Sequence, residues 1–194
     1  YPATVNFDGR KQLSLVIDSQ TEQEAAARLH IHLGLALSKG DRFDSALQKA
    51  TELGVSKVTP LITEFNTLKL PADRLQKKIQ HWAGINEAAC EQSGRGYLVE
   101  LDAPAKLMDW QSFDANATKL TLQPGTAKRL HDFQVTEKLV LLVGPEGGLS
   151  ETDLAIANDK GFSQVRLGRH ILRTETAPLA AIAAAQALWG DFHQ

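Results

Sequence analysis

The sequence is short of several residue types and features, and each shortage excludes a class of protein. It contains one cysteine, Cys90, so no internal disulfide can form, and its histidines and cysteine show no zinc-ligand spacing. We therefore expect a cytoplasmic protein without a metal site. No apolar run approaches the ~18 residues of a membrane span, and the N-terminus lacks the basic-then-apolar layout of a signal peptide. These shortages exclude a membrane-spanning protein and a disulfide-rich secreted domain.

Positive charge is not in excess either. The chain has 21 lysines and arginines against 23 acidic residues, a net charge of −2. Domains that bind nucleic acid are commonly basic, because they gain affinity by neutralising phosphates. The balance therefore argues against binding over the whole surface and leaves a local basic face possible. At 194 residues, with 43% hydrophobic and 23% charged residues, the chain fits one folded domain with a short piece left over.

The short piece is at the N-terminus. Residues 3–7 and 12–18 are strand-like runs on either side of Asp8 and Gly9, a dipeptide that suits a hairpin turn. The chain opens at Tyr1, without a methionine and inside strand-like sequence. We therefore expect this hairpin to be the end of a β module whose earlier part lies upstream.

The rest of the chain alternates strands and helices. Apolar residues at every second position predict a strand at residues 29–37, and Phe43, Leu47, Ala50 and Leu53 predict one face of a helix from about residue 41. Further strands are predicted at residues 55–62, 97–101, 119–122, 138–143 and 164–167, and further helices at residues 71–93, 105–113, from 150 and at 178–189. This alternation is typical of an α/β fold with a largely parallel sheet.

A glycine-rich loop follows the apolar run at residues 139–143 and leads into a helix. It contains Gly144, Pro145, Glu146, Gly147 and Gly148. Ligands of open parallel sheets bind beyond the carboxyl ends of strands, where glycines let them approach the backbone. The loop has neither the ending of a P-loop nor the spaced glycines of dinucleotide folds. It therefore predicts a ligand held by backbone hydrogen bonds, with a plain strand-to-helix turn as the alternative.

A second loop of the same kind follows the predicted strand at residues 164–167. Two neighbouring strand-end loops can enclose one ligand. Thr174 and Thr176 in this loop suit the capping of the last helix as well as they suit a ligand. Arg173 and Glu175 are harder to explain as caps, which makes them candidates for contact with a ligand.

Two polar clusters outside these loops are further candidates. Glu91, Gln92 and Arg95, at the end of the predicted helix at residues 71–93, could contact a base or a phosphate, or could simply lie at a solvated helix end. Lys39 and Arg42 lie in a strand-to-helix loop and could meet phosphates. Charged runs are more often solvated surface. The same caution applies to Arg74, Lys77 and Lys78.

Together these segments resemble the RsmE-type 16S rRNA uridine-N3 methyltransferases, a branch of the SPOUT superfamily. The resemblance extends from about residue 29 to the end of the chain, with the motifs in the family's order. Most specific is the glycine loop followed by the run at residues 167–177. The other matching motifs are at residues 39–42, 48–55 and 91–95.

The resemblance implies a SPOUT methyltransferase fold, an α/β fold with a parallel sheet and a C-terminal trefoil knot, which is a rare exception to unknotted connections. Members of the family carry an N-terminal PUA-like β-barrel. Residues 1–20 would be the tail of that barrel and residues 21–194 the methyltransferase domain. The resemblance also implies a homodimer that packs knot against knot, with Leu179, Ile182 and Leu188 serving both the core and the interface, or the core alone.

The resemblance further implies S-adenosylmethionine as the cofactor, bound in the knot mostly by backbone from three loops. The cofactor-binding residues that it implies are Leu122, Gln123, Pro124, Gly144, Pro145, Glu146, Gly147, Gly148, Leu167, Gly168, Ile171, Leu172, Arg173, Thr174, Thr176 and Ala177. Two of the three loops are those already selected from the residues alone.

The implied reaction is methylation of uridine N3 in 16S rRNA of the small ribosomal subunit. Uracil N3 is a weak acid, so the enzyme must supply a base or positive surroundings for the developing anion. Arg173 is the candidate for positioning or charge stabilisation, and Glu175 or Glu91 for the general base. The candidates for RNA contact are Lys39, Arg42, Gln92 and Arg95.

Three alternatives stay open at this point. One is a SPOUT methyltransferase that acts on another RNA position or on transfer RNA. Another is a non-catalytic RNA-binding ribosome-assembly protein that keeps the knot, against which the intact glycine loop argues. The third is a small-molecule α/β enzyme, which the acidic net charge favours and the set of motifs disfavours.

Overall fold

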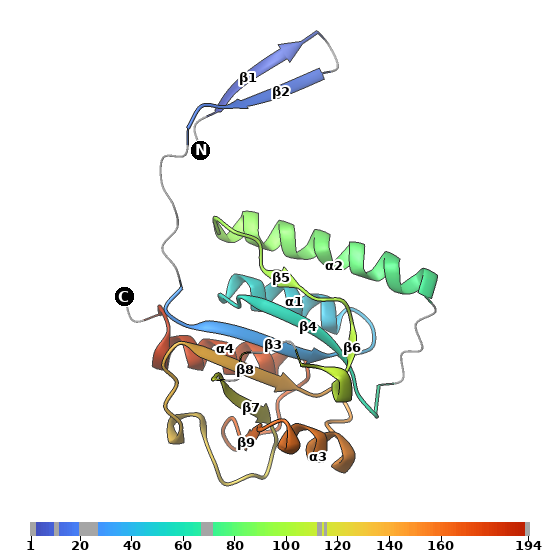
Figure 1. The fold of residues 1–194 in the computed structure, drawn as a ribbon, viewed down its shortest axis with the longest axis vertical. Helices are drawn as coiled ribbons and strands as arrows, with labels where there is room; N and C mark the ends of the chain where they lie inside the picture. The colour runs from blue at the N-terminus through green and yellow to red at the C-terminus, as the bar shows by residue number, and fades with distance from the viewer. Residues whose placement is uncertain are drawn as a thin grey trace.

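The computed structural model describes residues 3–9, 12–19, 27–66, 72–111, 114 and 116–192. Its centre is a seven-stranded sheet (Figure 1). The strands are β3 (His30–Ala36), β4 (Lys57–Ile62), β5 (Glu100–Leu101), β6 (Ala105–Lys106), β7 (Thr118–Leu122), β8 (Lys138–Val143) and β9 (Ser163–Val165). They lie in the order β5-β4-β3-β8-β7-β9, with β6 also paired to β4, and all pairs are parallel. The predicted α/β fold with a parallel sheet is therefore confirmed.

The helices of the described chain are α1 (Arg42–Glu52), α2 (Ala72–Ser93), α3 (Glu151–Asp159) and α4 (Thr176–Trp189). In α1 the residues Phe43, Leu47 and Ala50 are buried on one face, as their spacing predicted. Helix α3 starts at a capping box, in which the Ser150 hydroxyl accepts the Asp153 N–H and the Asp153 carboxylate accepts the Ser150 N–H. The capping box fixes the point at which the chain leaves the glycine loop.

Strand β8 shows how one strand supports two cores. Leu139 and Leu141 pack into the cluster formed with α1, α2 and α4, whereas Val140 and Leu142 pack into the cluster that contains Trp110. Successive side chains of a strand point to opposite faces, so a continuous apolar run is needed where both faces are covered. Figure 1 shows α1, α2 and α4 on one side of the sheet and α3 on the other.

The second core depends on a glycine in the middle of β3. A Cβ atom on Gly34 would lie 2.4 Å from the Trp110 ring and 2.8 Å from the Leu61 side chain. The indole therefore packs directly against the bare backbone of the strand, and any side chain at this position would displace it.

At the N-terminus, β1 (Ala3–Asp8) and β2 (Gln12–Ile17) form the predicted antiparallel hairpin, with Gly9 at a positive φ of 74°. Among the described strands they pair only with each other. Their apolar side chains are exposed, Phe7 by 76% and Ile17 by 64%. That the hairpin is the tail of a barrel stays a prediction.

One predicted helix is wrong. The segment at residues 105–113 forms β6 and then a single 3-10 turn at Leu107–Asp109, and residues 112 and 113 lie outside the described part. Leu107 and Trp110 are buried three residues apart, a spacing that suits one such turn as well as a helix. The predicted strand at residues 97–101 is also shorter than expected, because only Glu100 and Leu101 pair with β4.

Candidate functional site

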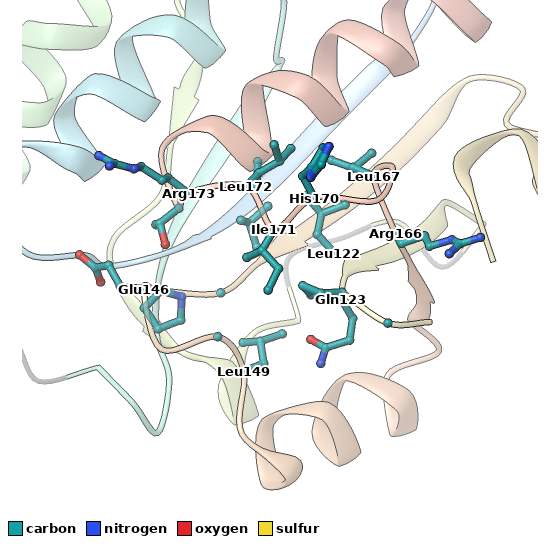
Figure 2. Close-up of a pocket in the computed structure, with 18 of the residues that line it drawn as sticks. Leu122, Gln123, Glu146, Leu149, Arg166, Leu167, His170, Ile171, Leu172 and Arg173 are labelled. Atoms are coloured by element: carbon teal, nitrogen blue, oxygen red, sulfur yellow. The ribbon is translucent and has the colours of Figure 1, made fainter. Parts of the chain in front are cut away.

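A cavity of about 680 Å³ opens at the carboxyl ends of β7, β8 and β9 (Figure 2). It is lined by residues 122–125, 143–149 and 165–175, together with Arg42 and Ala177. Its volume lies within the roughly 300–1,000 Å³ of small-molecule sites. The cavity therefore lies where an open parallel sheet places its ligand.

The glycine loop forms one wall and offers its backbone to the cavity. A Cβ atom on Gly144 would lie 3.0 Å from the Gly148 carbonyl carbon and 3.0 Å from the Leu149 side chain, so even a methyl group here would require its neighbours to shift by a few tenths of an ångström. Gly148 has a positive φ of 74°, and its N–H donates to the Pro145 carbonyl at 2.8 Å. The result is a tight turn whose glycines carry no side chain to cover the backbone beside the cavity.

The other two loops are joined to each other by backbone hydrogen bonds. The Gln123 N–H donates to the Val165 carbonyl at 2.9 Å, and the Arg166 N–H to the Lys128 carbonyl at 3.0 Å. Gly168 has a positive φ of 77°, which lets the chain turn back toward α4. There the N–H groups of Thr176 and Ala177 both donate to the Arg173 carbonyl. Three adjacent strand ends thus surround one space.

Apolar side chains form most of the remaining wall. Figure 2 shows Ile171 between Leu172 and Leu149, with Leu122 close by. Ile171 is 81% exposed although it lines the cavity. An exposed aliphatic side chain inside a concave site provides apolar surface that a ligand can cover. A flat or aliphatic ligand held by backbone hydrogen bonds fits this wall better than a polyphosphate does.

The rim carries a charged cluster that ties the loops to α1. Glu146 accepts hydrogen bonds from the Arg42 guanidinium at 2.6 Å and from the Lys39 N–H at 3.1 Å. Burial raises the pKa of the Glu146 carboxyl, but hydrogen bonds from its own N–H, from Arg42 and from Lys39 outweigh burial and lower it. Arg42 Nε also lies 3.8 Å from a Glu175 oxygen. One guanidinium therefore faces carboxylates from two loops.

One carboxylate oxygen of Glu175 accepts no hydrogen bond from the described part of the chain. This oxygen, Oε2, is buried, and the Arg42 contact at 3.8 Å is too long for a hydrogen bond. A buried acceptor without a donor is costly. In a cavity of this kind it is a candidate for contact with a ligand that brings an N–H or O–H group.

The glycine loop is also supported from β4. The Ser150 hydroxyl donates to the Glu64 carboxylate at 2.6 Å, and the Asp153 carboxylate accepts the Glu64 N–H. Phe65 lies against Gly147, 3.5 Å from where a Cβ atom would be. The loop after β4 therefore holds the loop after β8 in position.

The predicted cofactor-binding residues line this cavity, with one exception. Thr176 does not line it and is instead the first residue of α4, whose N-cap is Glu175 without a side-chain cap, so the alternative that Thr174 or Thr176 caps this helix is wrong. Several lining residues carry no motif of their own and were not predicted from the sequence. They are Arg42 as a cavity residue, Gly125, Val143, Leu149, Val165, Arg166, Arg169 and His170. Most of them are adjacent in sequence to a predicted residue, and this adjacency is the signal by which they could have been found.

Only some of the predicted catalytic and RNA-binding residues line the cavity. Arg173 and Glu175 line the cavity, although Figure 2 shows the Arg173 side chain pointing away from the central Ile171. Glu91 and Gln92 are exposed at the end of α2 and do not line the cavity of their own chain. The Arg95 guanidinium donates to the Thr51 carbonyl at 2.8 Å and stacks on Tyr97 at 4.8 Å. It thus links α2 to α1.

Among the described residues, no group of three or more histidines, cysteines or carboxylates could hold a metal ion. No helix in the described ranges is long and apolar enough to cross a membrane.

The fold is a parallel sheet, and a cavity opens at three adjacent strand ends. This arrangement is typical of α/β proteins that bind a small organic ligand. Comparison with known proteins narrows this class of proteins. A family model described as RNA methyltransferase domain matches residues 25–186. Relatives named Ribosomal RNA small subunit methyltransferase E include one from Buchnera aphidicola (subsp. Schizaphis graminum), 33% identical over 92% of this chain and 74% of that protein. Another, from Synechocystis, is 34% identical over 93% of this chain and 59% of that protein.

Solved structures that are similar to this chain point to the same family as the sequence relatives do. A Legionella pneumophila protein in complex with its bound cofactor SAM has a TM-score of 0.91 and 37% identity over 98% of this chain and 79% of its own. A ribosomal RNA small subunit methyltransferase E from Neisseria gonorrhoeae, bound to S-adenosyl methionine, has a TM-score of 0.89 with the same identity and coverage. The chain belongs to the RNA methyltransferase family of these ribosomal RNA small subunit methyltransferase E proteins.

Proposed function

We propose that this chain uses S-adenosylmethionine to methylate N3 of a uridine in 16S rRNA of the small ribosomal subunit. The observation that carries the proposal is the cavity formed by three backbone-lined loops, in a fold that superimposes on two relatives solved with this cofactor. The chain spans 59% to 74% of the length of the curated relatives compared above.

The residues of the cavity fit this cofactor. The turns at Gly148 and Gly168, both at positive φ, leave backbone uncovered by side chains beside the cavity, and Leu122, Ile171 and Leu172 offer apolar contact. When bound, the cofactor supplies a methyl group already activated by its positive sulfur. The protein therefore has to position the two reactants and manage one proton, and needs no covalent nucleophile.

The proton is on uridine N3, and we assign its removal to Glu175. The Glu175 carboxylate lines the cavity and has a buried oxygen free to accept a hydrogen bond. Arg42, 3.8 Å away, keeps the carboxylate in place. Glu91 was an equal candidate from sequence, but it does not line the cavity of its own chain. Arg173 remains our candidate for stabilising the anion that forms.

The experiment is transfer of labelled methyl groups to small ribosomal subunits that lack the modification, followed by nucleoside analysis. We expect 3-methyluridine as the product. In the Glu175→Gln variant the carboxamide keeps the shape but cannot take the proton, so kcat should fall about 10²-fold or more while cofactor affinity stays within a few-fold. Glu91→Gln is the matched control and should keep its kcat. Label in a different nucleoside would contradict the proposed target.

We also propose the finer architecture that the family resemblance implies. It includes a trefoil knot in the C-terminal segment, a PUA-like barrel of which residues 1–20 are the tail, a methyltransferase domain at residues 21–194, a homodimer and a cytoplasmic location. Two observations support parts of it. The hairpin leaves Phe7 and Ile17 exposed, which a barrel would cover, and α4 leaves Leu188 47% exposed, which a second copy would cover.

A further inference from the structure

Helix α2 carries a row of basic side chains on one face. Arg74, Lys77, Lys78 and His81 occupy positions i, i+3, i+4 and i+7, which fall on one side of an α-helix. Lys78 is partly exposed and the other three are exposed. We call these four residues the α2 basic row. It is a local basic face on a chain whose net charge is −2.

The order of charges along α2 is unfavourable for the helix itself. The basic row occupies the first turns, near the positive end of the helix dipole, while the last turn contains no basic residue. Glu87 and Glu91 lie in the second half, near the negative end. Cations are stabilising near the C-terminus of a helix and anions near its N-terminus. The effect is confined to the end turns, so Arg74 opposes it and the other three members gain nothing from it. The helix dipole therefore gives no reason for the place of the basic row.

The basic row is available to a partner. No described carboxylate lies within 4 Å of the Arg74, Lys77 or Lys78 head group, whereas other lysines on the surface, such as Lys49 and Lys138, pair with acids. The first three thus keep their full charge for a ligand outside the molecule. The phosphates of a nucleic-acid backbone can neutralise positive charges of this kind.

Two members of the row are also held in position. Lys78 Nζ lies 5.5 Å above the Trp82 ring. His81 Nε2 lies 2.7 Å from Asp44, whose other oxygen accepts the Trp82 indole N–H at 2.9 Å. Trp82 itself is buried against Phe43. The basic row therefore lies where α2 packs against α1.

The basic row lies on the same side of the molecule as the cavity. Arg42, which lines the cavity, is two residues before Asp44, the residue that holds His81. Ala72 is six residues after Asn66, so the start of α2 lies within about 22 Å of the loop that supports the glycine turn. Figure 1 shows α2 beginning on the side to which the arrowheads of β3 and β8 point.

We propose that the α2 basic row binds the phosphate backbone of the RNA strand whose target nucleotide enters the cavity. The inference rests on the proposed function. From Arg74 to His81 the row is about 10 Å long, enough to meet consecutive phosphates. A membrane surface fits less well, because the exposed neighbours Gln76 and Gln80 are polar where a bilayer needs apolar residues.

The test compares two double variants of equal charge. Arg74→Gln/Lys77→Gln removes two unpaired cations and keeps good helix formers, while the control, Lys49→Gln/Lys138→Gln, removes two cations that are paired with acids elsewhere. Affinity for naked 16S rRNA and for unmodified small subunits is measured at several salt concentrations. Cofactor affinity and kcat at saturating subunits are measured in parallel.

We expect the basic-row variant to bind both RNA substrates about tenfold more weakly, with the slope of log K against log salt reduced by about 1.4, or 0.7 for each lost contact to a single strand. Its cofactor affinity and kcat should be unchanged, and the control should bind within twofold of the parent. Arg74→Lys/Lys77→Arg keeps both charges and should restore binding, which separates loss of charge from damage to the helix.

Three results would overturn the proposal: unchanged affinity, an equal loss in the control, or a loss seen with subunits but not with naked rRNA, which would mean a protein contact. The proposed function is judged separately. If the parent protein methylates no RNA but binds rRNA through the basic row, the function fails and the row stands. If methylation proceeds and ignores these substitutions, the row fails and the function stands.

Discussion

The two halves of the same sheet differ in how fully their polar side chains are paired. Around the carboxyl ends of β7, β8 and β9 the chain leaves a polar atom without a hydrogen bond beside an open cavity, because Glu175 Oε2 has only its 3.8 Å ion pair with Arg42. In the first half of β3 and β4 it does the reverse. His32 bonds Thr59 at 2.7 Å, Thr59 donates to Asp102 at 2.7 Å, and Lys57 pairs with Asp102 at 3.0 Å. One half is built to bind a ligand and the other to hold the fold.

The protonation of the second half follows from its hydrogen bonds. The one hydroxyl proton of Thr59 goes to Asp102, so His32 Nε2 must donate to Thr59. The ring is neutral near pH 7 because burial lowers its pKa to about 4. Although burial lowers the pKa of Lys57, its hydrogen bonds and attraction to Asp102 and Glu100 outweigh burial and raise it. The charges that remain are paired, since Lys57 contacts both Asp102 and Glu100.

Substituting Gly34 should have the largest effect. In Gly34→Ala the new methyl group would lie 2.4 Å from the Trp110 ring, so the indole must move out of its core. We expect a loss of about 3 kcal/mol in the free energy of unfolding, measured by urea denaturation. The control is Gly84→Ala in α2, where nothing lies within 4 Å of the added atom. It should gain about 0.5–1 kcal/mol. Equal stability of the two variants would contradict the packing argument.

Acid should weaken the same half of the sheet through His32. Burial first, and then the charge of Lys57, lower the pKa of the ring to about 4, with Asp102 opposing in part. An unfolded histidine takes up its proton near pH 6.5, so this contribution to stability is fully present above pH 6.5. It is lost as pH falls from 6.5 to 4, by roughly 3 kcal/mol at most.

Two measurements check this. The His32 ring should titrate at about pH 4 when followed by NMR, and the unfolding free energy should fall over the stated range. In a His32→Gln variant, which has no proton to take up, the part of the fall that comes from this ring, between pH 6.5 and 4, should disappear. A His32 ring that titrates near pH 6.5 in the folded protein would refute the account.

Gly144→Ala should have the smallest effect on the fold and a selective one on binding. The added atom would lie 3.0 Å from the Gly148 carbonyl carbon, a contact that a shift of a few tenths of an ångström relieves. We expect less than about 1 kcal/mol of lost stability but about tenfold weaker cofactor binding, because the shifted turn is the wall of the cavity. Calorimetric titration of S-adenosylmethionine measures it. Unchanged affinity would mean that this turn does not contact the cofactor.

The comparison also explains which parts of the site were predictable. The glycine loop and the loop at residues 167–177 are continuous in sequence, and a strand that leads into glycines is a local signal. Arg42 was predicted to meet RNA, but it lies on the cavity wall and pairs with Glu146. That contact joins residues 104 apart in the chain, and no periodicity in the sequence reports a contact of this kind.

The failed prediction of a helix at residues 105–113 has the same cause. Leu107 and Trp110 have helical spacing, but Ala105 pairs with Leu61 of β4 and the Trp110 ring fits against Gly34 of β3. Local propensity is weak compared with such tertiary contacts. A three-residue turn was therefore enough to bury both side chains.

By itself the sequence determined the alternation of strands and helices, the family and the two loops that form most of the cavity, because each depends on residues close together in the chain. Only the tertiary structure decided that Arg42 faces two carboxylates, that Glu91 lies outside the cavity of its own chain and that the α2 basic row stands on the side of the cavity. These facts depend on how distant segments pack, and packing depends on the shape of the whole core rather than on any one segment.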